Sequence, residues 1–518
     1  MQTADTVLYN EALHHSGAAT KAPMLDKRML YVNNNEGNSS SYSDNVVTFE
    51  TMTLSNGGRW CDYSEGYISI PVVTTVLRSG THQTAAQAAQ SIHFKSGPVI
   101  IDSVQIQYGN NPMVQQRKHV SAYSSFKQHT TYSQDDVAVV GDSSSYFKPS
   151  SKWDYDDANG FGLISYDVMK KAGDPQFLST ANVSQASVMG ASLKNSGVDV
   201  YEKVGNTHVF YHDCIIRLKD LLFFQELEIV KGSNIILTIS LNQCEMVTTY
   251  TAGVLTHANS LQGSVCPVMR CVSNLTEAEQ NTEDAATFTE TVSVKVVKNG
   301  AHAHKKTQCR LYVPTYTMEP QAEIAYLSAQ SVQKIRYCDI NVSHIRNVQS
   351  GQTFSHLITN SLARAKRLIV VPMLSAQAAA GGSPALLTPQ TSLFCSEPAT
   401  CSPCYIKDFQ VSISGTNVYM TQNQYPYERF QDEMAGKQGL NGGRNTGLMS
   451  GMIGLKDYES NFGYLVCDLS RRRAEDEMTP VALTISGSLE SPLQMDFLVF
   501  CEYEKDISID ISTGAMED

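Results

Sequence analysis

The chain has 518 residues, of which 42% are hydrophobic and 17% charged, and it carries a formal net charge of −12. This length exceeds what one ordinary core accommodates, so we expect two or more domains, and the composition excludes disorder over most of the chain. The negative charge argues against a general nucleic-acid binder, and we find neither an 18-residue apolar run nor a signal-peptide pattern in the first 17 residues.

Small polar residues are abundant, and long runs of Ala, Glu, Lys and Leu are missing, which favours many short strands over helices. The twelve cysteines are scattered along the chain. Several of them, including Cys214, Cys309, Cys467 and Cys501, lie in strand-like runs. We therefore expect reduced cysteines that are buried as small apolar side chains.

Residues 1–45 are polar and are interpreted as an N-terminal arm. Ile68, Ile70 and Val72 then alternate as in a half-buried strand, and Pro71 among them indicates a sheet edge or a bulge. Another strand is predicted at residues 94–108. Residues 109–160 are polar with few apolar anchors, which predicts a long surface loop system.

Residues 209–222 and 227–241 are predicted to form a strand pair, and residues 242–290 a second long insertion. Residues 323–332 form the one convincing helix near the middle of the chain. We interpret residues 317–333 as a helical connector between two halves.

The second half repeats the pattern of the first. In residues 405–450, Ile406, Phe409 and Val411 form a strand pattern that a turn at Gly415 ends, and residues 101–113 show the same pattern. Four anchors recur in the same order: Ile70-Pro71 with Val371-Pro372, Gln105 with Gln410, Gly162 with Gly447, and Leu237 with Leu483. Ordered anchors of this kind indicate one fold used twice.

Short strands joined by long connections suit an antiparallel β-sandwich of the jelly-roll type. We therefore predict an all-β chain of two tandem jelly-roll β-sandwiches, a double jelly roll with long loop insertions and a short helical connector. The first sandwich is expected at residues 46–316 and the second at residues 334–518.

A search for catalytic motifs yields no Walker A loop, no G-x-G-x-x-G after a strand, no G-x-S-x-G and no H-E-x-x-H. His302 and His304 form an H-x-H pair, but the glutamate of a cupin-type metal site is missing, so a solvated basic loop is the favoured interpretation. Cys395, Cys401 and Cys404 offer three thiolates for zinc, against a reduced surface loop that is favoured because no second pair lies near. No catalytic, cofactor-binding or metal-binding residue is predicted.

Two basic clusters, Arg471-Arg472-Arg473 and Arg364 with Lys366 and Arg367, offer contacts for phosphate or an acidic partner. We favour solvated, self-neutralising loops for both. Tyr425 and Tyr427 fit a subunit contact or ordinary loop packing equally well. Residues 426–445 are predicted to be a surface or subunit-contact loop.

Several phrases resemble the double jelly-roll major capsid proteins of eukaryotic double-stranded DNA viruses, most closely the polinton-like and adintovirus group, with adenovirus hexon as a distant relative. The phrases are FKSGPVIIDSVQIQYGNNPMVQ at 94–115, CRLYVPTYTMEPQAEIAYLSAQSVQKIRYCDI at 309–340, GQTFSHLITNSLARAKRLIVVP at 351–372, YLVCDLSRR at 464–472 and ISGSLESPLQMDFLVFCEYEKDISID at 485–510. They touch both halves and the connector.

The resemblance implies a structural protein of the virion and no enzyme. Such proteins form homotrimers, and three copies of two sandwiches make a pseudo-hexameric capsomer that tiles an icosahedral shell. The implied partners are neighbouring capsomers, penton proteins and minor capsid proteins, without sequence-specific nucleic-acid binding and without a cofactor. The long loops would then interlock subunits and form outer towers.

Two other functions compete with this one. A tandem β-sandwich protein that binds a receptor or a glycan would need an aromatic cleft, and Trp60 and Trp153 are the only tryptophans. A metal-dependent enzyme of cupin type would depend on His302 and His304.

Overall fold

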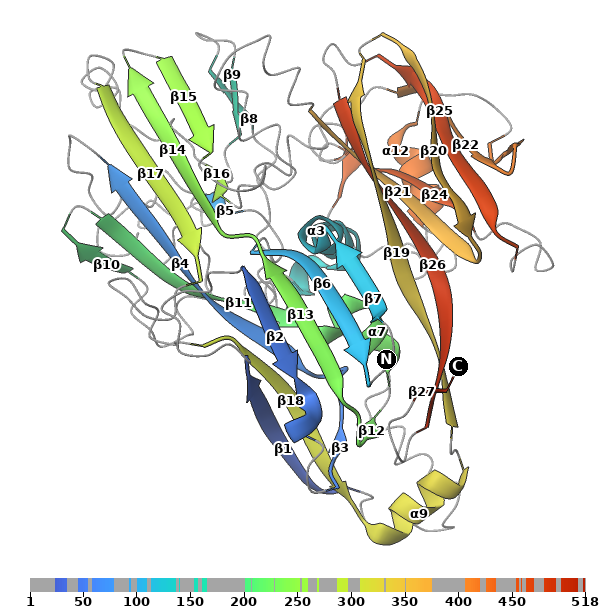
Figure 1. Ribbon diagram of the computed structural model, residues 1–518. Helices are drawn as coiled ribbons and strands as arrows, with labels where there is room; N and C mark the ends of the chain where they lie inside the picture. The colour runs from blue at the N-terminus through green and yellow to red at the C-terminus, as the bar shows by residue number, and fades with distance from the viewer. Residues whose placement is uncertain are drawn as a thin grey trace.

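The computed structural model shows two β-sandwiches that lie side by side, with a helix at the bottom joining them (Figure 1). The structure describes residues 24–34, 45–54, 58–78, 93–94, 100–109, 113–136, 139, 153–156, 161–164, 201–205, 207–227, 229–251, 254–259, 268–269, 287–296, 308–329, 332–349, 351–374, 406–419, 425–434, 453–455, 458, 463–469, 479–490, 495–510 and 516–517.

The first sandwich consists of two sheets in which neighbouring strands are antiparallel. One sheet contains the path β1 (Met24–Asn33), β18 (Arg310–Met318), β4 (Tyr67–Arg78) and β11 (Thr207–Arg217). The other has the order β2 (Val46–Glu50), β13 (Ile235–Leu241), β6 (Ile101–Tyr108) and β7 (Met113–Lys118). Their facing apolar side chains form one core.

The second sandwich repeats this arrangement strand for strand. One sheet has the order β19 (Val332–Val348), β26 (Met495–Asp510), β21 (Ala365–Leu374) and β24 (Leu465–Asp468). The other has the order β20 (Thr353–Leu362), β25 (Val481–Leu489), β22 (Ile406–Ile413) and β23 (Thr416–Asn417). In both sandwiches the first, eighth, third and sixth strands of the motif form one sheet, and the second, seventh, fourth and fifth form the other. This is the jelly-roll path, and the predicted double jelly roll is confirmed.

The remaining elements extend or connect the two sandwiches. The shorter strands are β3 (Trp60–Cys61), β5 (His93–Phe94), β8 (Trp153–Asp156), β9 (Phe161–Ile164), β10 (Tyr201–Val204), β12 (Val230–Lys231), β14 (Cys244–Thr251), β15 (Val254–Asn259), β16 (Val268–Met269), β17 (Thr287–Lys295) and β27 (Met516–Glu517). The helices are η1 (Thr51–Thr53), α3 (Val120–Thr131), α4 (Gln134–Asp136), η6 (Leu218–Leu221), α7 (Phe223–Glu226), α9 (Pro320–Ala329) and α12 (Tyr427–Met434).

The strand predictions rest on alternation, and the repeated Leu-Thr-Ile-Ser segments show why they work. In β13 every second side chain is buried, as the period of two along a strand requires. Leu237 in β13 and Leu483 in β25 occupy the same strand of their sandwiches, so this anchor pair is confirmed. Leu237 pairs with Ile106, whereas Leu483 pairs with Ile413.

The match of Gln105 with Gln410 identifies the correct strands, β6 and β22, but is displaced by two residues in the pairing register. In β6, Gln105 faces Thr238. The equivalent Thr484 faces Ser412 and not Gln410. The letters of one strand do not report its register, because the register is set by the pairing with the neighbouring strand, here β25.

Pro71 lies in β4, which is a central strand and not a sheet edge. β4 pairs with β11 through Pro71 without a break, and its other side pairs with β18 at residues 67–69 and with β17 at residues 73–78. On that second side, Pro71 lies in the gap between the residues that pair with β18 and those that pair with β17. Its missing N–H therefore costs no hydrogen bond between strands. Pro372 sits in the equivalent strand β21, beyond the residues that pair with β24.

Three further expectations need correction. The arm at residues 1–45 includes β1, which pairs with β18 from Met24 to Asn33 and so belongs to the first sandwich. Residues 209–222 and 227–241 do not pair, because β11 and β13 lie in different sheets. The loop systems at 109–160 and 242–290 contain β7 and α3, and β14 and β15, respectively.

The connector helix α9 lies within residues 317–333 and is held to the first sandwich. Lys231 Nζ forms an ion pair with Glu323 Oε1 at 2.5 Å, and the rings of Trp60 and Tyr326 meet edge to face at 5.6 Å between centroids. The chain then enters β19, which pairs with β26 over nearly its whole length.

The β19–β26 pair is shared by the two cores. Its lower end places Ile335, Tyr337 and Ile509 in the core of the first sandwich, whereas Phe497 and Val499 lie in the core of the second. The two sandwiches are therefore joined by packing as well as by the connector. This continuity means that residue 334 is not a boundary between independent cores.

Six of the cysteines in the described ranges form no disulfide, and five of these are buried, as expected: Cys61, Cys214, Cys309, Cys467 and Cys501, with Cys338 half-buried. Burial raises the pKa of the Cys61 thiol to about 12, which suppresses its reactivity. Among the residues that the structure covers, no helix has the length and apolar character to cross a membrane.

Candidate functional site: the seam between the sandwiches

Most residues singled out for metal or phosphate chemistry lie outside the described residues. These are His302, His304, Cys395, Cys401, Cys404 and Arg471-Arg472-Arg473. Gly447 and the side chain of Trp153 are also outside them. Within the described ranges, no group of three or more His, Cys, Asp or Glu side chains is placed to hold a metal ion.

The second basic cluster is not the solvated loop that we expected. Lys366 and Arg367 lie in β21, and all three side chains pair with carboxylates of β26. Arg364 pairs with Asp506, Lys366 with Glu504 at 3.4 Å, and Arg367 with Glu502 at 3.0 Å. Arg367 is only 6% exposed and is therefore internal, whereas Arg364 and Lys366 are half-buried and are neutralised by carboxylates of the same chain.

Tyr425 and Tyr427 pack within the chain. The Tyr425 hydroxyl donates to the carbonyl oxygen of Val466, and the Tyr427 hydroxyl donates to that of Ile453 at 2.9 Å. The predicted contact loop at 426–445 begins as helix α12, whose Phe430 is buried. The interpretation as a surface loop is therefore wrong for residues 427–434, and residues 435–445 lie outside the described part.

The structure brings together a different set of residues, where the sandwiches meet. We call this contact the seam: β7, α3 and α7 of the first sandwich against β19, β21 and β26 of the second. Helix α3 lies between the sandwiches (Figure 1). Its Tyr123 ring meets Phe500 of β26 at 5.7 Å and its Phe126 ring meets Tyr464 at 5.1 Å, both edge to face.

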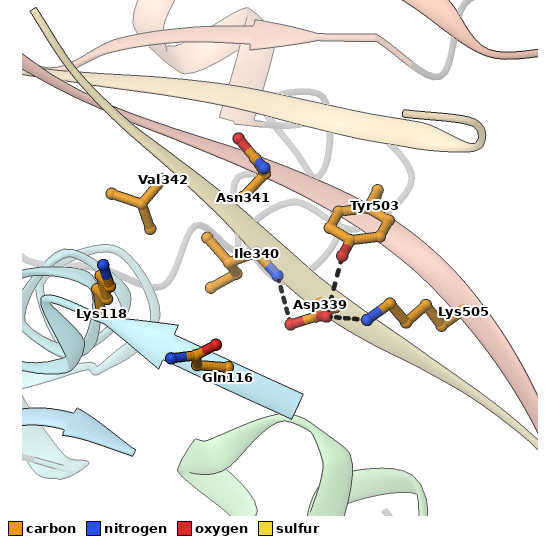
Figure 2. Close-up of a pocket in the computed structure, with 8 residues that line it drawn as sticks. All are labelled: Gln116, Lys118, Asp339, Ile340, Asn341, Val342, Tyr503 and Lys505. Carbon is orange, nitrogen blue, oxygen red and sulfur yellow. Dashed lines mark hydrogen bonds and ion pairs between the residues drawn. The ribbon is translucent and has the colours of Figure 1, made fainter. Parts of the chain in front are cut away.

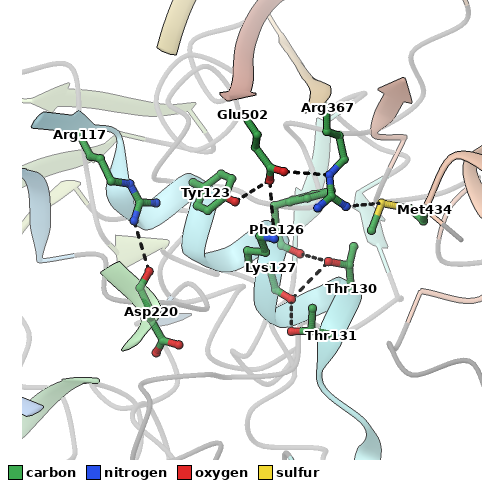
Figure 3. A network of polar contacts seen from close by, with 10 residues as sticks. All are labelled: Arg117, Tyr123, Phe126, Lys127, Thr130, Thr131, Asp220, Arg367, Met434 and Glu502. Carbon is green, nitrogen blue, oxygen red and sulfur yellow. Dashed lines mark hydrogen bonds and ion pairs between the residues drawn. The ribbon is translucent and has the colours of Figure 1, made fainter. Parts of the chain in front are cut away.

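A buried carboxylate, Glu502 of β26, lies at the centre of the seam (Figure 3). Its Oε1 accepts a hydrogen bond of 2.6 Å from the Tyr123 hydroxyl, and its Oε2 accepts one of 3.0 Å from Arg367 Nε. Lys127 Nζ of α3 lies 3.6 Å from Oε1. Two of these three partners come from the first sandwich, so the carboxylate joins both halves of the chain.

The electrostatics of Glu502 follow from this geometry. Burial by itself raises the pKa of a carboxyl group, because it disfavours the charged form. The positive charges of Arg367 and Lys127 and the hydrogen bond from Tyr123 outweigh it and lower the pKa of Glu502 to about 2. The group is therefore ionised at neutral pH and holds its donors in place.

Arg117 of β7 is a second buried charge at the seam. Its guanidinium lies over the Tyr123 ring at 4.7 Å from the centroid, and Nη1 donates to the Asp220 carbonyl oxygen at 3.2 Å (Figure 3). Burial lowers the pKa of Arg117. Its Nη2 has no hydrogen-bond partner among the described residues, so cation–π contact and nearby carboxylates supply its stabilisation.

Asp339 of β19 forms a second polar link across the seam, through Gln115 of β7, and Figure 2 shows its contacts with Tyr503 and Lys505. Its Oδ1 accepts from Gln115 Nε2 of β7 at 3.2 Å, and its Oδ2 accepts from the Tyr503 hydroxyl at 3.0 Å and from Lys505 Nζ at 2.5 Å. Asp339, Tyr503 and Lys505 border a cavity of about 400 Å³ that Gln116 and Lys118 of the first sandwich also line.

The chemistry of the seam is structural. The carboxylates of Glu502 and Asp339 accept hydrogen bonds from charged, hydroxyl or amide side chains. No activated nucleophile is among these donors. Removing one partner of such a pair leaves a buried charge uncompensated, so the arrangement favours one orientation of the sandwiches over others.

Sequence reasoning missed these residues, although one signal was present. Glu502 directly follows the run MDFLVFC and is buried like the residues of that run. Gln115 and Arg117 occupy alternate positions of β7 that are buried. A charged residue within a buried pattern indicates a paired charge. The sequence does not identify the partner of Glu502, because Tyr123 is 379 residues away along the chain.

Fold and seam together define a double jelly-roll protein whose two sandwiches pack against each other. No known family model and no curated protein matches the sequence. Among solved structures, a chain of the Sputnik virophage determined by cryo-EM is similar over 96% of this chain and 90% of that chain, with 10% identity and a TM-score of 0.53.

Two further structures are similar at lower TM-scores. The mavirus major capsid protein has a TM-score of 0.49 and 11% identity, covering 97% of this chain and 92% of that chain. The Faustovirus major capsid protein has a TM-score of 0.47 and 10% identity, covering 94% and 92%. At 10% identity, the similarity to the Sputnik chain concerns the fold alone.

Proposed function

We propose that this chain is a major capsid protein of a double-stranded DNA virus and has no enzymatic role. It would form homotrimers, and each trimer would be a pseudo-hexameric capsomer in an icosahedral shell. The observation that supports this proposal most directly is that one jelly-roll path occurs twice in a single chain, in the same strand order. Three such chains present six similar sandwiches around one axis.

The seam supports this role. A shell subunit transmits load between neighbours, so its two sandwiches must keep a fixed orientation. The buried Glu502 and Asp339 links and the shared β19–β26 pair supply that rigidity. Charged links of this kind define orientation more than they add stability.

A solved structure of similar fold also supports this proposal. The Sputnik chain comes from a virophage, and it is similar over nearly the full length of both chains. The narrower placement beside the polinton-like and adintovirus group rests on the sequence phrases alone. We propose the virion as the location of the protein, with neighbouring capsomers, penton proteins and minor capsid proteins as its partners.

The receptor- or glycan-binding alternative gains no support from the side chains described. Trp60 is fully buried against Tyr326 and α9, so it is not available to stack on a sugar.

The test is the assembly state of the purified protein. Light scattering after size exclusion should give three times the chain mass of 56.9 kDa, and negative-stain images should show particles with a hexagonal outline. A monodisperse monomer over all concentrations, salts and pH values tried would refute the proposal.

A further inference from the structure

The cavity of about 400 Å³ at the seam, which we call the seam cavity, has walls from both sandwiches. Gln116 and Lys118 extend from β7 of the first sandwich. Residues 339–342 of β19, with Tyr503 and Lys505 of β26, form the wall on the second sandwich (Figure 2). A cavity of this size is large enough for a small molecule, and junctions between domains are frequent positions for such sites. The seam cavity is therefore a candidate binding site.

Three polar side chains of the wall have unused hydrogen-bonding capacity. Lys118, Gln116 and Asn341 line the cavity, and none of them forms a side-chain hydrogen bond or ion pair with another described residue. Lys118 and Gln116 are exposed, and Asn341 is half-buried. One ammonium group and two side-chain amides thus remain available as donors. They come from opposite walls, so one ligand can accept hydrogen bonds from both sandwiches.

The charge of the wall favours an anion. Lys118 and Lys505 are positive and Asp339 is negative, so the wall carries a net charge of +1. The negative charge is already occupied, because Asp339 Oδ2 accepts from Lys505 Nζ at 2.5 Å and from the Tyr503 hydroxyl at 3.0 Å. A cation in the cavity would have to compete with Lys505, whereas an oxyanion gains a charge-assisted hydrogen bond from Lys118.

The rest of the wall is apolar or aromatic. Ile340 and Val342 line the cavity and belong to the apolar cluster that α3 forms with β19 and β26. The side chain of Tyr503 lies beside them in the same wall. A ligand that fills the cavity therefore presents apolar or aromatic surface beside its charged group, as is usual for small-molecule sites with a few convergent polar groups.

We propose that the seam cavity binds a small molecule that carries one phosphate or carboxylate group on a short apolar or aromatic body. Lys118 and Gln116 of the first sandwich and Asn341 of the second donate to the oxyanion. Ile340 and Val342 contact the body of the ligand. The bound molecule bridges the two sandwiches and so stabilises the seam. This inference goes beyond the proposed function, because it concerns a single chain.

The first test measures the chemistry of the ligand by isothermal titration calorimetry at constant ionic strength. Phenyl phosphate and benzoate are the anionic probes, and benzyl alcohol is the neutral control of similar size. We expect at least one anion to bind, which also identifies the charged group, and benzyl alcohol to bind roughly tenfold more weakly or less. Absence of binding by both anions at millimolar concentration, or equal binding of benzyl alcohol, overturns the inference.

The second test removes the free cation. Lys118→Gln changes an exposed side chain without a described partner, so the fold should be kept. The loss of one charge-assisted hydrogen bond should weaken binding of the anionic probe by roughly tenfold or more. The matched control is Lys334→Gln, because Lys334 is an exposed lysine of β19 that does not line the cavity. Equal affinity of Lys118→Gln and wild type overturns the inference.

The third test examines the wall on the second sandwich. Asn341→Asp keeps the size of the side chain and places a carboxylate next to the bound oxyanion, so it should also weaken binding by roughly tenfold or more. Far-UV circular dichroism confirms the fold of the variant. Unchanged affinity would confine the contacts to the first sandwich and overturn the bridging arrangement.

Bridging has a consequence for stability that surface binding at one sandwich does not share. A ligand that needs both walls binds only the closed seam, so the anionic probe at a hundred times its Kd should raise the midpoint of the first thermal unfolding transition by several degrees. Lys118→Gln should show a smaller rise at the same concentration. Binding without any rise in this midpoint overturns the inference.

The outcome is independent of assembly. If phenyl phosphate or benzoate binds as expected but the chains never associate, the proposed capsid function fails and the seam cavity stands as a binding site. If trimers form and neither anion binds, only the inference about the seam cavity is wrong.

Discussion

Replacing Arg367 by methionine tests whether the seam depends on compensation of buried charge. The substitution keeps a long unbranched side chain on β21 and removes the guanidinium that donates to Glu502 at 3.0 Å. Glu502 is 1% exposed, so water cannot replace the lost donor without opening the seam.

The magnitude follows from the pKa of Glu502. Its pKa falls from an ordinary 4.5 to about 2, and each unit is worth about 1.4 kcal/mol, so the ionised group contributes about 3 kcal/mol to stability. Breaking a buried pair by removing one partner costs about 3–5 kcal/mol. Because Tyr123 and Lys127 remain, we expect a loss of about 3 kcal/mol.

Guanidinium chloride unfolding, followed by fluorescence and far-UV circular dichroism, measures the loss. The first transition is the relevant one, because a chain of this size need not unfold in a single step. The matched control is Arg336→Met, since Arg336 pairs with Asp506 at 3.0 Å but its side chain is 64% exposed. An exposed pair is worth about 0–1 kcal/mol.

Equal destabilisation by the two substitutions would refute the reasoning. A second comparison measures the interaction of the pair. Because Arg367 and Glu502 interact directly, the loss in the double variant Arg367→Met with Glu502→Gln should be smaller than the sum of the losses in the two single variants.

The remaining predictions concern pH, packing and reactivity. Because the folded pKa of Glu502 lies below its unfolded value, its contribution is complete above about pH 5 and is lost as the pH falls toward 2; acid unfolding of Glu502→Gln should depend less on pH, and an unchanged dependence would contradict this. Phe126→Ala should cost about 3–5 kcal/mol in the first unfolding transition, because the ring is fully buried in the seam; a loss below about 1 kcal/mol would show that α3 does not hold the sandwiches together. Gly487→Ala should destabilise the second sandwich by about 1–3 kcal/mol in thermal unfolding, since the new Cβ would lie 2.8 Å from Ile406 Cγ2, and wild-type stability would disprove that contact. Cys61 should resist iodoacetamide at pH 8 until the protein unfolds, because burial raises its thiol pKa to about 12; mass spectrometry of alkylated peptides would reveal early labelling if the thiol were accessible.

Local patterns were enough to identify the fold. Alternating burial in β13, the repeated Leu-Thr-Ile-Ser segments and the two Ile/Val-Pro pairs locate equivalent strands in both sandwiches. Alternation is a property of the strand itself, so one sequence reveals it. The order of such strands then indicates a fold used twice.

Local patterns failed where burial comes from two sides. Helix α3 reads as a polar loop, VSAYSSFKQHTT, yet nine of its twelve residues are buried. It has no single apolar face because it lies between two sandwiches, and the usual helical stripe indicates one buried side only. The strand β1 was missed for the opposite reason, since it is an edge strand with most of its side chains exposed and shows no alternation of buried and exposed residues.

The sequence by itself determined the duplicated sandwich, the burial of five of the described cysteines and the helical connector, because the signal for each lies within a few neighbouring residues. Only the tertiary structure decided that Arg367 is an internal partner of Glu502, that Tyr123 crosses the seam to reach it, and that Tyr31, Tyr312 and Tyr67 form a row. These pairs are separated by 135, 379 and more than two hundred residues. Coulombic and packing partners at such separations are set by strand register, and register is a property of the assembled sheets.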